Sequence, residues 1–391
     1  MRCEWDAIVV GLGGLGSAAA YWLARRLGER VLGLEQFELG HARGASADHS
    51  RIIRLSYHRP DYVRLARRAY ATWAELEADC GSRIVTRTGG LDLFPPAASI
   101  AEADYSASMA AEAVPFERLD AAETMLRVPA WRLDDGTVAL YQAAAGIADP
   151  YRANAAHQRR ARELGATLLG NARVTSLVDA GGEVDVTLAD GTTHRTGHVV
   201  IAADAWTNDL LASFDRSLPL TVTREQVTYF NPTNGEAFEP ERFPVWIWMD
   251  DPSFYGFPTY GEPGPKAGED VGGRATTADG RDFATDHAAL ARLTDFLDRH
   301  LPGMAERELL TKTCLYTLTP DRDFVVDRLP EQPAVIVLLG AAHGFKFASL
   351  LGQIAADLAI DGTTAAREEI TAFQIDRPIL REATPATRHV I

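Results

Sequence analysis

A glycine-rich turn between an apolar segment and a helix-like segment constrains this chain more than any other feature. Residues 5–10 form a short apolar run that leads into residues 11–16, which read GLGGLG. An alanine-rich stretch follows over residues 17–27, and a second apolar run over residues 30–34 ends at Glu35. A buried strand, a GxGxxG turn, a helix, a second strand and an acid in this order are typical of a dinucleotide-binding βαβ unit.

Each part of this unit has a physical role. Gly11 permits the tight turn, Gly13 lets the backbone approach a pyrophosphate, and Gly16 lets the helix lie close to the strand. The N-terminus of the helix adds a partial positive charge, and Glu35 is placed to accept hydrogen bonds from a ribose. The residues expected to bind a dinucleotide here are Gly11, Gly13, Gly14, Leu15, Gly16, Glu35 and Gln36.

The residues after this unit favour FAD over NAD. The stretch 40–50 is polar and contains glycine, and it leads into an apolar run bracketed by Arg51 and Arg54. A nicotinamide-dependent dehydrogenase would begin another strand–helix unit here. Near the other end of the chain, an apolar strand at 334–339 and a helix at 345–360 are expected to return to the nucleotide-binding domain. An interleaved domain of this kind nearly excludes a simple NAD-dependent dehydrogenase.

Four sequence blocks carry a resemblance to a known family. They are SRIIR at 50–54, YGFP at 255–258, TCLYT at 313–317 and GAAHGFKF at 340–347. In the order and spacing of these blocks, the chain resembles the monomeric sarcosine oxidase and N-methyltryptophan oxidase family. Members of that family are FAD-dependent amine oxidases related to D-amino acid oxidase. The likeness extends from residue 6 to about residue 378.

The resemblance and the order of the expected elements indicate an α/β plus α+β fold. A Rossmann-like FAD-binding domain over residues 1–82, 148–217 and 318–391 is expected to interleave with a substrate domain over residues 83–147 and 218–317. Prolines, aromatic residues and short alternating runs in the second part of the substrate domain predict a mainly antiparallel sheet.

The resemblance implies further cofactor-binding residues. Cys314 matches the cysteine through which family members attach the flavin covalently, by a thioether to its 8α-methyl group. On composition alone, a single cysteine among apolar residues would be a small core side chain. The other residues implied to contact the cofactor are Ser46, Ser50, Arg51, Val174, Trp206, Gly344, Phe345 and Lys346.

Four cations are implied to act on the substrate or on oxygen. Arg54 offers a planar fork for bidentate pairing with a substrate carboxylate, and Lys346 would bind the same group. Lys266 follows a Pro-Gly-Pro loop and matches the family lysine that activates oxygen over the flavin. Arg51 would add positive potential beside it. A fixed cation stabilises the negative charge that develops on oxygen.

Three further residues complete the expected catalytic set. Tyr255 and Tyr316 match family tyrosines that line the pocket and orient the substrate, although aromatic core residues would also fit these alternating strands. His343 lies at the start of the last expected helix, where it would contact the cofactor or act as a base. Hydride transfer to a flavin requires a neutral amine but no strong base.

Two features depart from the family pattern. Family members often carry a histidine a few residues after the lysine, whereas this chain has Glu269 and Asp270. Acids at these positions would repel a substrate carboxylate and suit an added cation. Trp246 and Trp248 are expected to place bulky rings on a strand that faces the pocket. Both features weaken sarcosine itself as the preferred substrate.

Composition and charge bear on partners and location. A formal net charge of −15 disfavours binding to nucleic acid, and no run is long and apolar enough to predict a membrane span. Cys3, Cys80 and Cys314 lack the spacing of a disulfide framework or a zinc site, so we expect no metal and a reducing, cytoplasmic location. The implied partners are a small amino-acid or amine substrate and O2, for a protein that acts as a monomer.

The expected activity is the oxidation of secondary or N-methyl amino acids. A hydride would pass from the α-carbon or the N-methyl carbon to flavin N5, giving an imine, and O2 would then be reduced to H2O2. A close alternative is an oxidase of cyclic amino acids such as pipecolate or proline. The sequence is also compatible with a flavin dehydrogenase that uses an acceptor different from O2, and with a flavin-binding protein without catalysis.

Overall fold

The glycine-rich unit folds as the sequence predicts. In the computed structural model, which describes residues 4–382 and 385–387, strand β1 (Trp5–Val10) leads into helix α1 (Gly14–Leu27). Strand β2 (Val31–Leu34) follows and pairs in parallel with β1. A Cβ atom at Gly16 would lie 1.8 Å from the carbonyl oxygen of Gly11. Only glycine therefore lets the helix begin this close to the strand.

Within the described residues, the two strands of this unit belong to a first sheet of eight strands. Its main path has the order β10-β11-β12-β1-β2-β9, and β20 joins beside β12 and carries β19. The pairs β1–β12, β2–β9 and β12–β20 are parallel. The added strands are β9 (Thr167–Leu169), β10 (Val174–Asp179), β11 (Val184–Leu188), β12 (Thr193–Ile201), β19 (Val325–Leu329) and β20 (Gln332–Leu339). Strands from both ends of the chain thus meet in one sheet, which confirms the interleaved fold.

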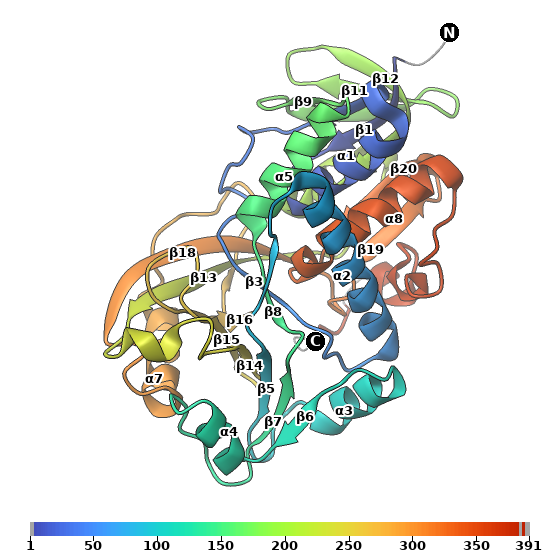
Figure 1. Cartoon of the computed structure of the whole chain (residues 1–391). Coiled ribbons are helices and arrows are strands. Elements are labelled where there is room, and N and C mark those ends of the chain that lie inside the picture. Colours follow the sequence, from blue (N-terminus) through green and yellow to red (C-terminus); the bar gives the residue numbers. More distant parts are fainter. Residues whose placement is uncertain (1–3, 383–384, 388–391) are drawn as a thin grey trace.

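Helices from three parts of the chain pack beside this sheet (Figure 1). Helix α1 contacts both α5 (Pro150–Glu163) and α8 (Ala348–Asp361), and α8 also contacts α2 (Pro60–Cys80). A Cβ atom at Gly352 of α8 would lie 2.6 Å from the backbone of Ala18 in α1. The close crossing of α1 and α8 depends on this glycine, and it holds α8 against the glycine-rich unit.

A second sheet occupies the other end of the molecule (Figure 1). Counting described residues only, it has nine strands in the order β17-β13-β16-β15-β14-β5-β7-β6, with β18 paired along β13. Its pairs are antiparallel except β5–β14. These strands are β5 (Gly90–Phe94), β6 (Glu117–Leu119), β7 (Val138–Gln142), β13 (Thr221–Asn231), β14 (Val245–Trp248), β15 (Ser253–Phe257), β16 (Lys266–Asp270), β17 (Arg274–Ala275) and β18 (Arg307–Leu318). The mainly antiparallel sheet expected from the sequence is confirmed.

In the part of the chain that the structure describes, there are also a small third sheet and four further α-helices. The sheet joins β3 (Arg51–Ile53), β8 (Gly146–Ala148) and β4 (Val85–Arg87) in the order β3-β8-β4. The remaining α-helices are α3 (Glu102–Ala111), α4 (Ala121–Arg127), α6 (Thr207–Leu211) and α7 (His287–His300). A short 3-10 helix, η5 (Gly344–Phe347), leads directly into α8. The α/β plus α+β fold class is therefore confirmed.

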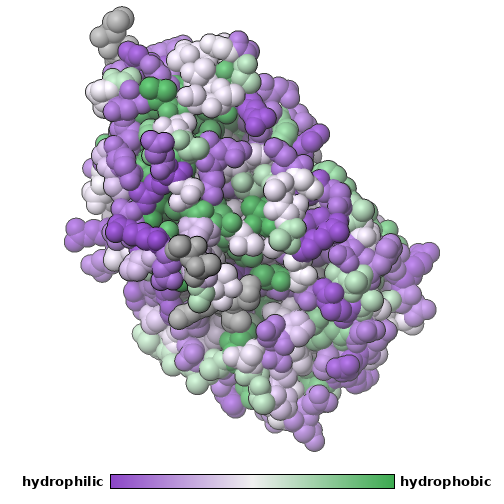
Figure 2. Space-filling model, turned by 180° about the vertical axis from the view of Figure 1, so that it is seen from behind, coloured by the Kyte–Doolittle hydropathy of each residue, from purple (hydrophilic) through white to green (hydrophobic). Residues whose placement is uncertain are grey.

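The surface is mixed in character. Figure 2 shows hydrophilic residues over much of the face opposite to that of Figure 1, with hydrophobic residues interspersed. Within the described ranges, no helix combines the length and apolarity needed to cross a membrane. The same part of the chain holds no cluster of His, Cys, Asp and Glu side chains suited to a metal ion. Cys80 and Cys314 are free thiols, and Cys3 lies outside the described residues.

Candidate active site

A cavity of about 690 Å³ is lined by residues of both large sheets. Every residue that the sequence predicts for cofactor, substrate or oxygen lines it except Gly16, whose place is the contact between helix α1 and the turn. The lining includes Gly11, Gly13, Gly14, Leu15, Glu35, Gln36, Ser46, Ser50, Arg51, Arg54, Val174, Trp206, Tyr255, Lys266, Cys314, Tyr316, His343, Gly344, Phe345 and Lys346. Residues far apart in the sequence therefore form one site.

The glycine turn and Glu35 form one end of this cavity. Glu35 is buried and accepts hydrogen bonds from the backbone N–H of Leu12 at 2.9 Å and of Phe37 at 3.1 Å. Burial opposes its ionisation, but hydrogen bonds from His41 and from these backbone groups outweigh burial and lower the pKa of Glu35. An ionised carboxylate has further lone pairs, so Glu35 can still accept hydrogen bonds from hydroxyl groups.

The same end fits the pyrophosphate and ribose of FAD. Ser46 Oγ accepts a hydrogen bond from the backbone N–H of Gly14 at 3.0 Å, which ties the loop to the start of α1. A Cβ atom at Gly14 would lie 2.7 Å from the ring of Phe345. The cavity wall is therefore bare backbone at the positive end of a helix, with a buried carboxylate nearby. These are the groups that a dinucleotide requires.

Lys266 begins strand β16 and is almost fully buried, with 2% of its side chain exposed. Its Nζ donates to Oδ2 of Asp48 at 2.9 Å and to the carbonyl of Ser50 at 3.0 Å. It also lies 4.3 Å from the centre of the Phe257 ring. Burial lowers the pKa of Lys266 to about 8, and attraction to Asp48 opposes that effect. Lys266 is thus a cavity cation and not a surface lysine on a loop.

Lysine is rare in this chain and is confined to the cavity. Three of the 39 Lys and Arg residues are lysines, namely Lys266, Lys312 and Lys346, and all three line the cavity. Lys312 Nζ donates to Oδ1 of Asp48 at 2.9 Å. No motif predicts Lys312, although its place two residues before Cys314 on one strand puts both side chains on the same face.

Arg51 and Cys314 also line the cavity. The Arg51 guanidinium donates to the carbonyls of Ala45, Ala47 and Ser50, each at 2.8 Å, and so organises the loop before β3. Burial raises the pKa of the Cys314 thiol to about 11, and Arg51 acts in the opposite direction. Cys314 is therefore a protonated thiol that faces the cofactor cavity.

Arg54 and Lys346 differ in how their charges are compensated. Arg54 forms a buried ion pair with Asp92, with 2.5 Å between Nη1 and Oδ1. The Nζ of Lys346 makes no hydrogen bond or ion pair with any residue that the structure describes. Burial, and then repulsion from Arg54, lowers the pKa of Lys346 to about 7. Of these two cations, Lys346 is therefore the one whose positive charge is free to meet a ligand.

Tyr255, Tyr316 and His343 also line the cavity. Burial raises the pKa of both tyrosines, so their hydroxyls stay protonated and can donate hydrogen bonds. His343 Nε2 lies 2.8 Å from the carbonyl of Arg322, and because a carbonyl only accepts, Nε2 carries the hydrogen. Burial and the nearby Lys346 lower the pKa of His343 well below its usual value. A neutral, tethered imidazole suits a positioning role better than proton uptake.

Arg322 is a lining residue that no sequence motif reveals. Its guanidinium pairs with Asp270 at 2.9 Å, and Glu269 pairs with Arg292 at 2.7 Å. The two acids that were expected to repel a carboxylate and to suit an added cation therefore already have arginine partners. Their repulsion of a carboxylate is correspondingly reduced.

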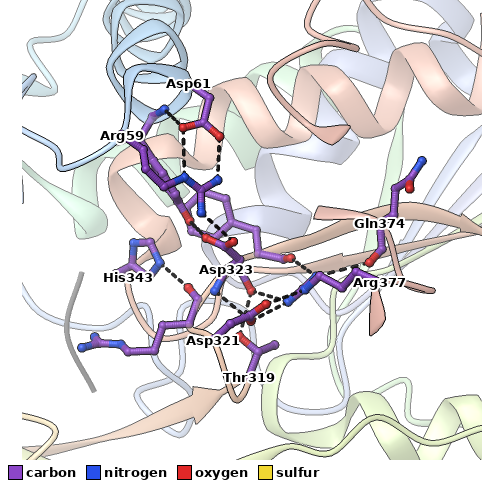
Figure 3. Close-up of polar contacts among 11 residues, drawn as sticks. Arg59, Asp61, Thr319, Asp321, Asp323, His343, Gln374 and Arg377 are labelled. Carbon is purple, nitrogen blue, oxygen red and sulfur yellow. Dashed lines mark hydrogen bonds and ion pairs between the residues drawn. The ribbon is translucent and has the colours of Figure 1, made fainter. Parts of the chain in front are cut away.

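The turn that carries Arg322 is held by a network of ion pairs beside His343 (Figure 3). Asp321 accepts two hydrogen bonds from Arg377, at 2.8 and 2.9 Å. Asp323 accepts one from Arg59 at 2.9 Å. These contacts fix the backbone of the turn, and with it the carbonyl that sets the tautomer of His343.

The expected placement of Trp246 and Trp248 is wrong. Both rings are buried on the other face of β14, where Trp246 contacts Trp131 and both tryptophans contact Phe296. Ile247 lines the cavity in their place, because successive side chains of a strand point to opposite faces. The wall here is aliphatic and less bulky than the sequence suggests.

Comparison with known proteins agrees with this geometry. The model of the FAD dependent oxidoreductase family matches residues 6–358. The chain is 38% identical to monomeric sarcosine oxidase from Streptomyces avermitilis, over 93% of this chain and 96% of that protein. It is 32% identical to peroxisomal sarcosine oxidase from Homo sapiens, over 95% of this chain and 96% of that protein.

A solved structure extends the comparison to three dimensions. NikD, an unusual amino acid oxidase essential for nikkomycin biosynthesis, is 29% identical in its open form, with a TM-score of 0.83 over 95% of this chain and 98% of NikD. The resemblance carried by the four sequence blocks is therefore confirmed. With a family model and relatives that span most of its length, this chain belongs to the FAD-dependent oxidoreductase family.

Proposed function

We propose that the protein is an FAD-dependent oxidase of secondary or N-methyl amino acids that forms an imine and H2O2. The observation that carries this proposal is the presence of two differently held lysines in one cavity, Lys266 buried and Lys346 half-buried. Lys346 Nζ has no hydrogen-bond or ion-pair partner among the described residues, where it lies over the ring of Tyr57, and it matches a substrate carboxylate. Lys266 is held by Asp48 and matches the negative charge that develops on oxygen. The identity to two sarcosine oxidases supports the same activity.

The charges near Lys346 suit a ligand with one carboxylate. Arg54 is compensated by Asp92, and Arg322 is compensated by Asp270. Lys346 then leaves this part of the cavity with one uncompensated positive charge. A monocarboxylate would neutralise it through a charge-assisted hydrogen bond, whereas a second carboxylate would remain unpaired. We therefore infer a simple amino acid as the substrate class.

FAD is the cofactor that the glycine-rich end fits. Gly11, Gly13 and Gly14 would hold its pyrophosphate at the N-terminus of α1, and Glu35 would accept hydrogen bonds from the ribose. When bound, FAD accepts the hydride from the substrate and passes the electron pair to O2. Cys314 would attach the cofactor covalently.

The chain's own side chains would position the reacting atoms. Lys346 and Arg54 would bind the substrate carboxylate, and the hydroxyls of Tyr255 and Tyr316 would donate hydrogen bonds that orient the substrate. The carbon that gives up the hydride would thereby be held in one place. Lys266 would stay charged to stabilise the reduction of O2 to H2O2, with Arg51 adding positive potential.

A peroxide and oxygen-consumption assay against a panel of amines tests this proposal. N-methyl amino acids should reduce the enzyme and release H2O2. A preference for pipecolate or proline would instead favour an oxidase of cyclic amino acids. Reduction of a dye without oxygen uptake would favour a dehydrogenase. If no amine reduces the flavin under anaerobic conditions, the proposal is wrong.

The covalent bond has a separate test. After acid precipitation of the purified protein, the yellow colour should stay with the pellet, and Cys314→Ala should release it into the supernatant. Cys80→Ala is the matched control, because Cys80 does not line the cavity. Colour in the supernatant of the unaltered protein would contradict covalent attachment.

We further propose that residues 1–82, 148–217 and 318–391 form the FAD-binding domain and that residues 83–147 and 218–317 form the substrate domain. Residues 1–3, 383–384 and 388–391 of the first domain lie outside the described residues. The membership of strands in the first and second sheets supports this division. We also propose a monomer, supported by the monomeric relative from Streptomyces avermitilis, and a cytoplasmic location, supported by the scarcity of cysteine. Sedimentation at equilibrium of the FAD-loaded protein measures its mass and tests the oligomeric state.

A further inference from the structure

Asp48, in the loop before β3, accepts hydrogen bonds from three side chains. Its Oδ2 accepts from Lys266 Nζ at 2.9 Å, and its Oδ1 accepts from Lys312 Nζ at 2.9 Å and from the hydroxyl of Tyr229 at 2.7 Å. Only 7% of the Asp48 side chain is exposed. One nearly buried carboxylate thus joins two of the three lysines in the chain.

The backbone conformation and hydrogen bonds around Asp48 hold this carboxylate in place. Asp48 has a φ of 88°, in a region that few residues other than glycine adopt, although Asp and Asn tolerate it better than most. The carbonyls of Ala47 and Ser50, on either side, both accept hydrogen bonds from Arg51. Ser50 also accepts from Lys266. The loop, the carboxylate and the lysine are therefore joined by hydrogen bonds.

The charges around Lys266 show what Asp48 contributes. Burial and the Arg51 guanidinium on β3 both disfavour the ammonium, and Lys312 on β18 brings another positive charge to the same carboxylate. The Cys314 thiol on β18 is protonated and neutral at neutral pH.

Two aromatic residues complete the surroundings of Lys266. The Tyr229 hydroxyl on β13 donates to Asp48, and burial raises its pKa, so it is neutral as well. Phe257 on β15 presents only its ring. Asp48 is therefore the anion in direct contact with Lys266.

Asp48 itself stays ionised over the range in which Lys266 titrates. Burial acts to raise its pKa, but Lys266 and Arg51 lower the pKa of Asp48 well below its usual value. Because Asp48 is ionised over this whole pH range, its attraction for the ammonium is constant. The pKa of Lys266 therefore depends on whether Asp48 is present and not on the protonation of Asp48.

We propose that Asp48 is a positioning residue that keeps Lys266 protonated and fixes its Nζ in the cavity. Lys312 occupies the other oxygen of Asp48 and is held in turn by Glu262 at 2.7 Å. An ammonium has three hydrogens, and Asp48 and Ser50 accept two of them from Lys266, which leaves one for a ligand. This inference rests on the proposed function of Lys266 and deepens it, because the charge offered to oxygen then depends on Asp48.

The rarity of lysine makes a direct measurement practical. In FAD-loaded protein labelled with ¹³C at the lysine ε-carbons, the three lysines give three signals, which the variants Lys266→Met, Lys312→Gln and Lys346→Met assign. In Asp48→Asn, which keeps the shape and tolerates the backbone conformation, the pKa of Lys266 should fall by about 1–3 pH units from that of the unaltered protein. The signal of Lys346 should titrate as before, which makes it an internal control.

Lys312→Gln is the matched variant. It removes a positive charge from the other oxygen of Asp48, so the pKa of Lys266 should stay the same or rise, opposite to the effect of Asp48→Asn. Should Asp48→Asn not fold, Asp48→Gly suits a φ of 88° and carries the same test. The proposal would be overturned if Lys266 had the same pKa in the Asp48 variant as in the unaltered protein. It would also be overturned if the pKa values of all three lysines shifted equally.

Stopped-flow reoxidation gives a second readout that separates this inference from the proposed function. In Asp48→Asn the reoxidation rate at pH 7 should fall about tenfold and recover as the pH is lowered, because acid restores the ammonium. A merely structural defect would lower the rate at every pH. If Lys266→Met reoxidises at the normal rate while the lysine signals shift as expected, the role of Lys266 with oxygen is wrong and that of Asp48 stands.

Discussion

The two most buried lysines of the cavity obtain their charge in different ways. Lys266 has a carboxylate of the protein, Asp48, at 2.9 Å, whereas Lys346 has no hydrogen-bond or ion-pair partner in the described part of the chain. Burial lowers both pKa values, to about 8 for Lys266 and to about 7 for Lys346. A buried ammonium is costly without an anion. This difference supports our proposal that the protein supplies the counter-charge of Lys266 and that the substrate supplies the counter-charge of Lys346.

The largest effect should come from removing Arg54, the cation whose charge Asp92 compensates. Arg54→Ala removes a guanidinium and leaves Asp92 buried without its partner, so KM for amino acids should rise by roughly 30–5000-fold, or about 2–5 kcal/mol. The double variant Arg54→Ala with Asp92→Asn should recover part of this loss, because it removes the stranded anion. Steady-state kinetics measures both. An equal loss with amines that lack a carboxylate would show Arg54 to be structural.

Lys266→Met should separate the two half-reactions. Loss of one charge-stabilising donor in a water-poor site slows a reaction by roughly 10²–10³-fold, and reoxidation of the reduced flavin should slow by this factor. Reduction of the flavin by substrate under anaerobic conditions should change far less. Stopped-flow absorbance follows each step alone. Reoxidation at the normal rate would assign oxygen activation to another group, with Arg51 the next candidate.

Lys346→Met should impair the reaction with the substrate and not reoxidation, and by a smaller factor than Lys266→Met. A hydrogen bond to a charged group contributes about 1.5–3 kcal/mol, so kcat/KM for amino acids should fall roughly 10–150-fold. Reoxidation should be unaffected, since Lys346 is not proposed to act on oxygen. The comparison between the two lysines fails if each variant impairs both half-reactions to the same extent.

The smallest effect is a pH dependence of carboxylate binding. Because the pKa of Lys346 is lowered to about 7, this lysine is charged below that pH and neutral above it. The Kd of a simple aliphatic carboxylate should therefore be constant below about pH 7 and rise about tenfold per pH unit above it. Absorbance changes of the flavin on titration report the Kd. Lys346→Met should show weak binding with no such slope.

The parts of the site that depend on local sequence could be predicted. The turn at 11–16 needs glycine because Gly16 meets the carbonyl of Gly11 within the same short segment. The position of Lys346 beside a helix start is likewise local. For such features, the residue types and their spacing contain most of the physical information.

The counter-ions of the cavity could not be predicted in this way. Asp48 and Lys266 are 218 residues apart, and Arg54 and Asp92 are 38 residues apart, so neither pair follows from a motif. The sequence does indicate that Asp92 has a partner, because an acid within the apolar run GLDLF of β5 requires a buried counter-charge. The sequence does not show which face of β14 meets the cavity, because both faces carry apolar side chains. Trp246 is buried in a hydrophobic core, and Ile247, which lines the cavity, also packs against core residues.

A chain whose lysines all line one cavity has an unusual chemical surface. Reagents that acylate or reductively alkylate amines modify the lysines that cover most proteins, whereas here arginine carries the positive charge elsewhere. Lys312, with 30% of its side chain exposed, is the first lysine that such a reagent would reach. Its modification would remove a hydrogen bond to Asp48. Immobilisation through lysine amines would therefore attach this protein at the cavity, and coupling through carboxylates is the chemistry that leaves the cavity lysines intact.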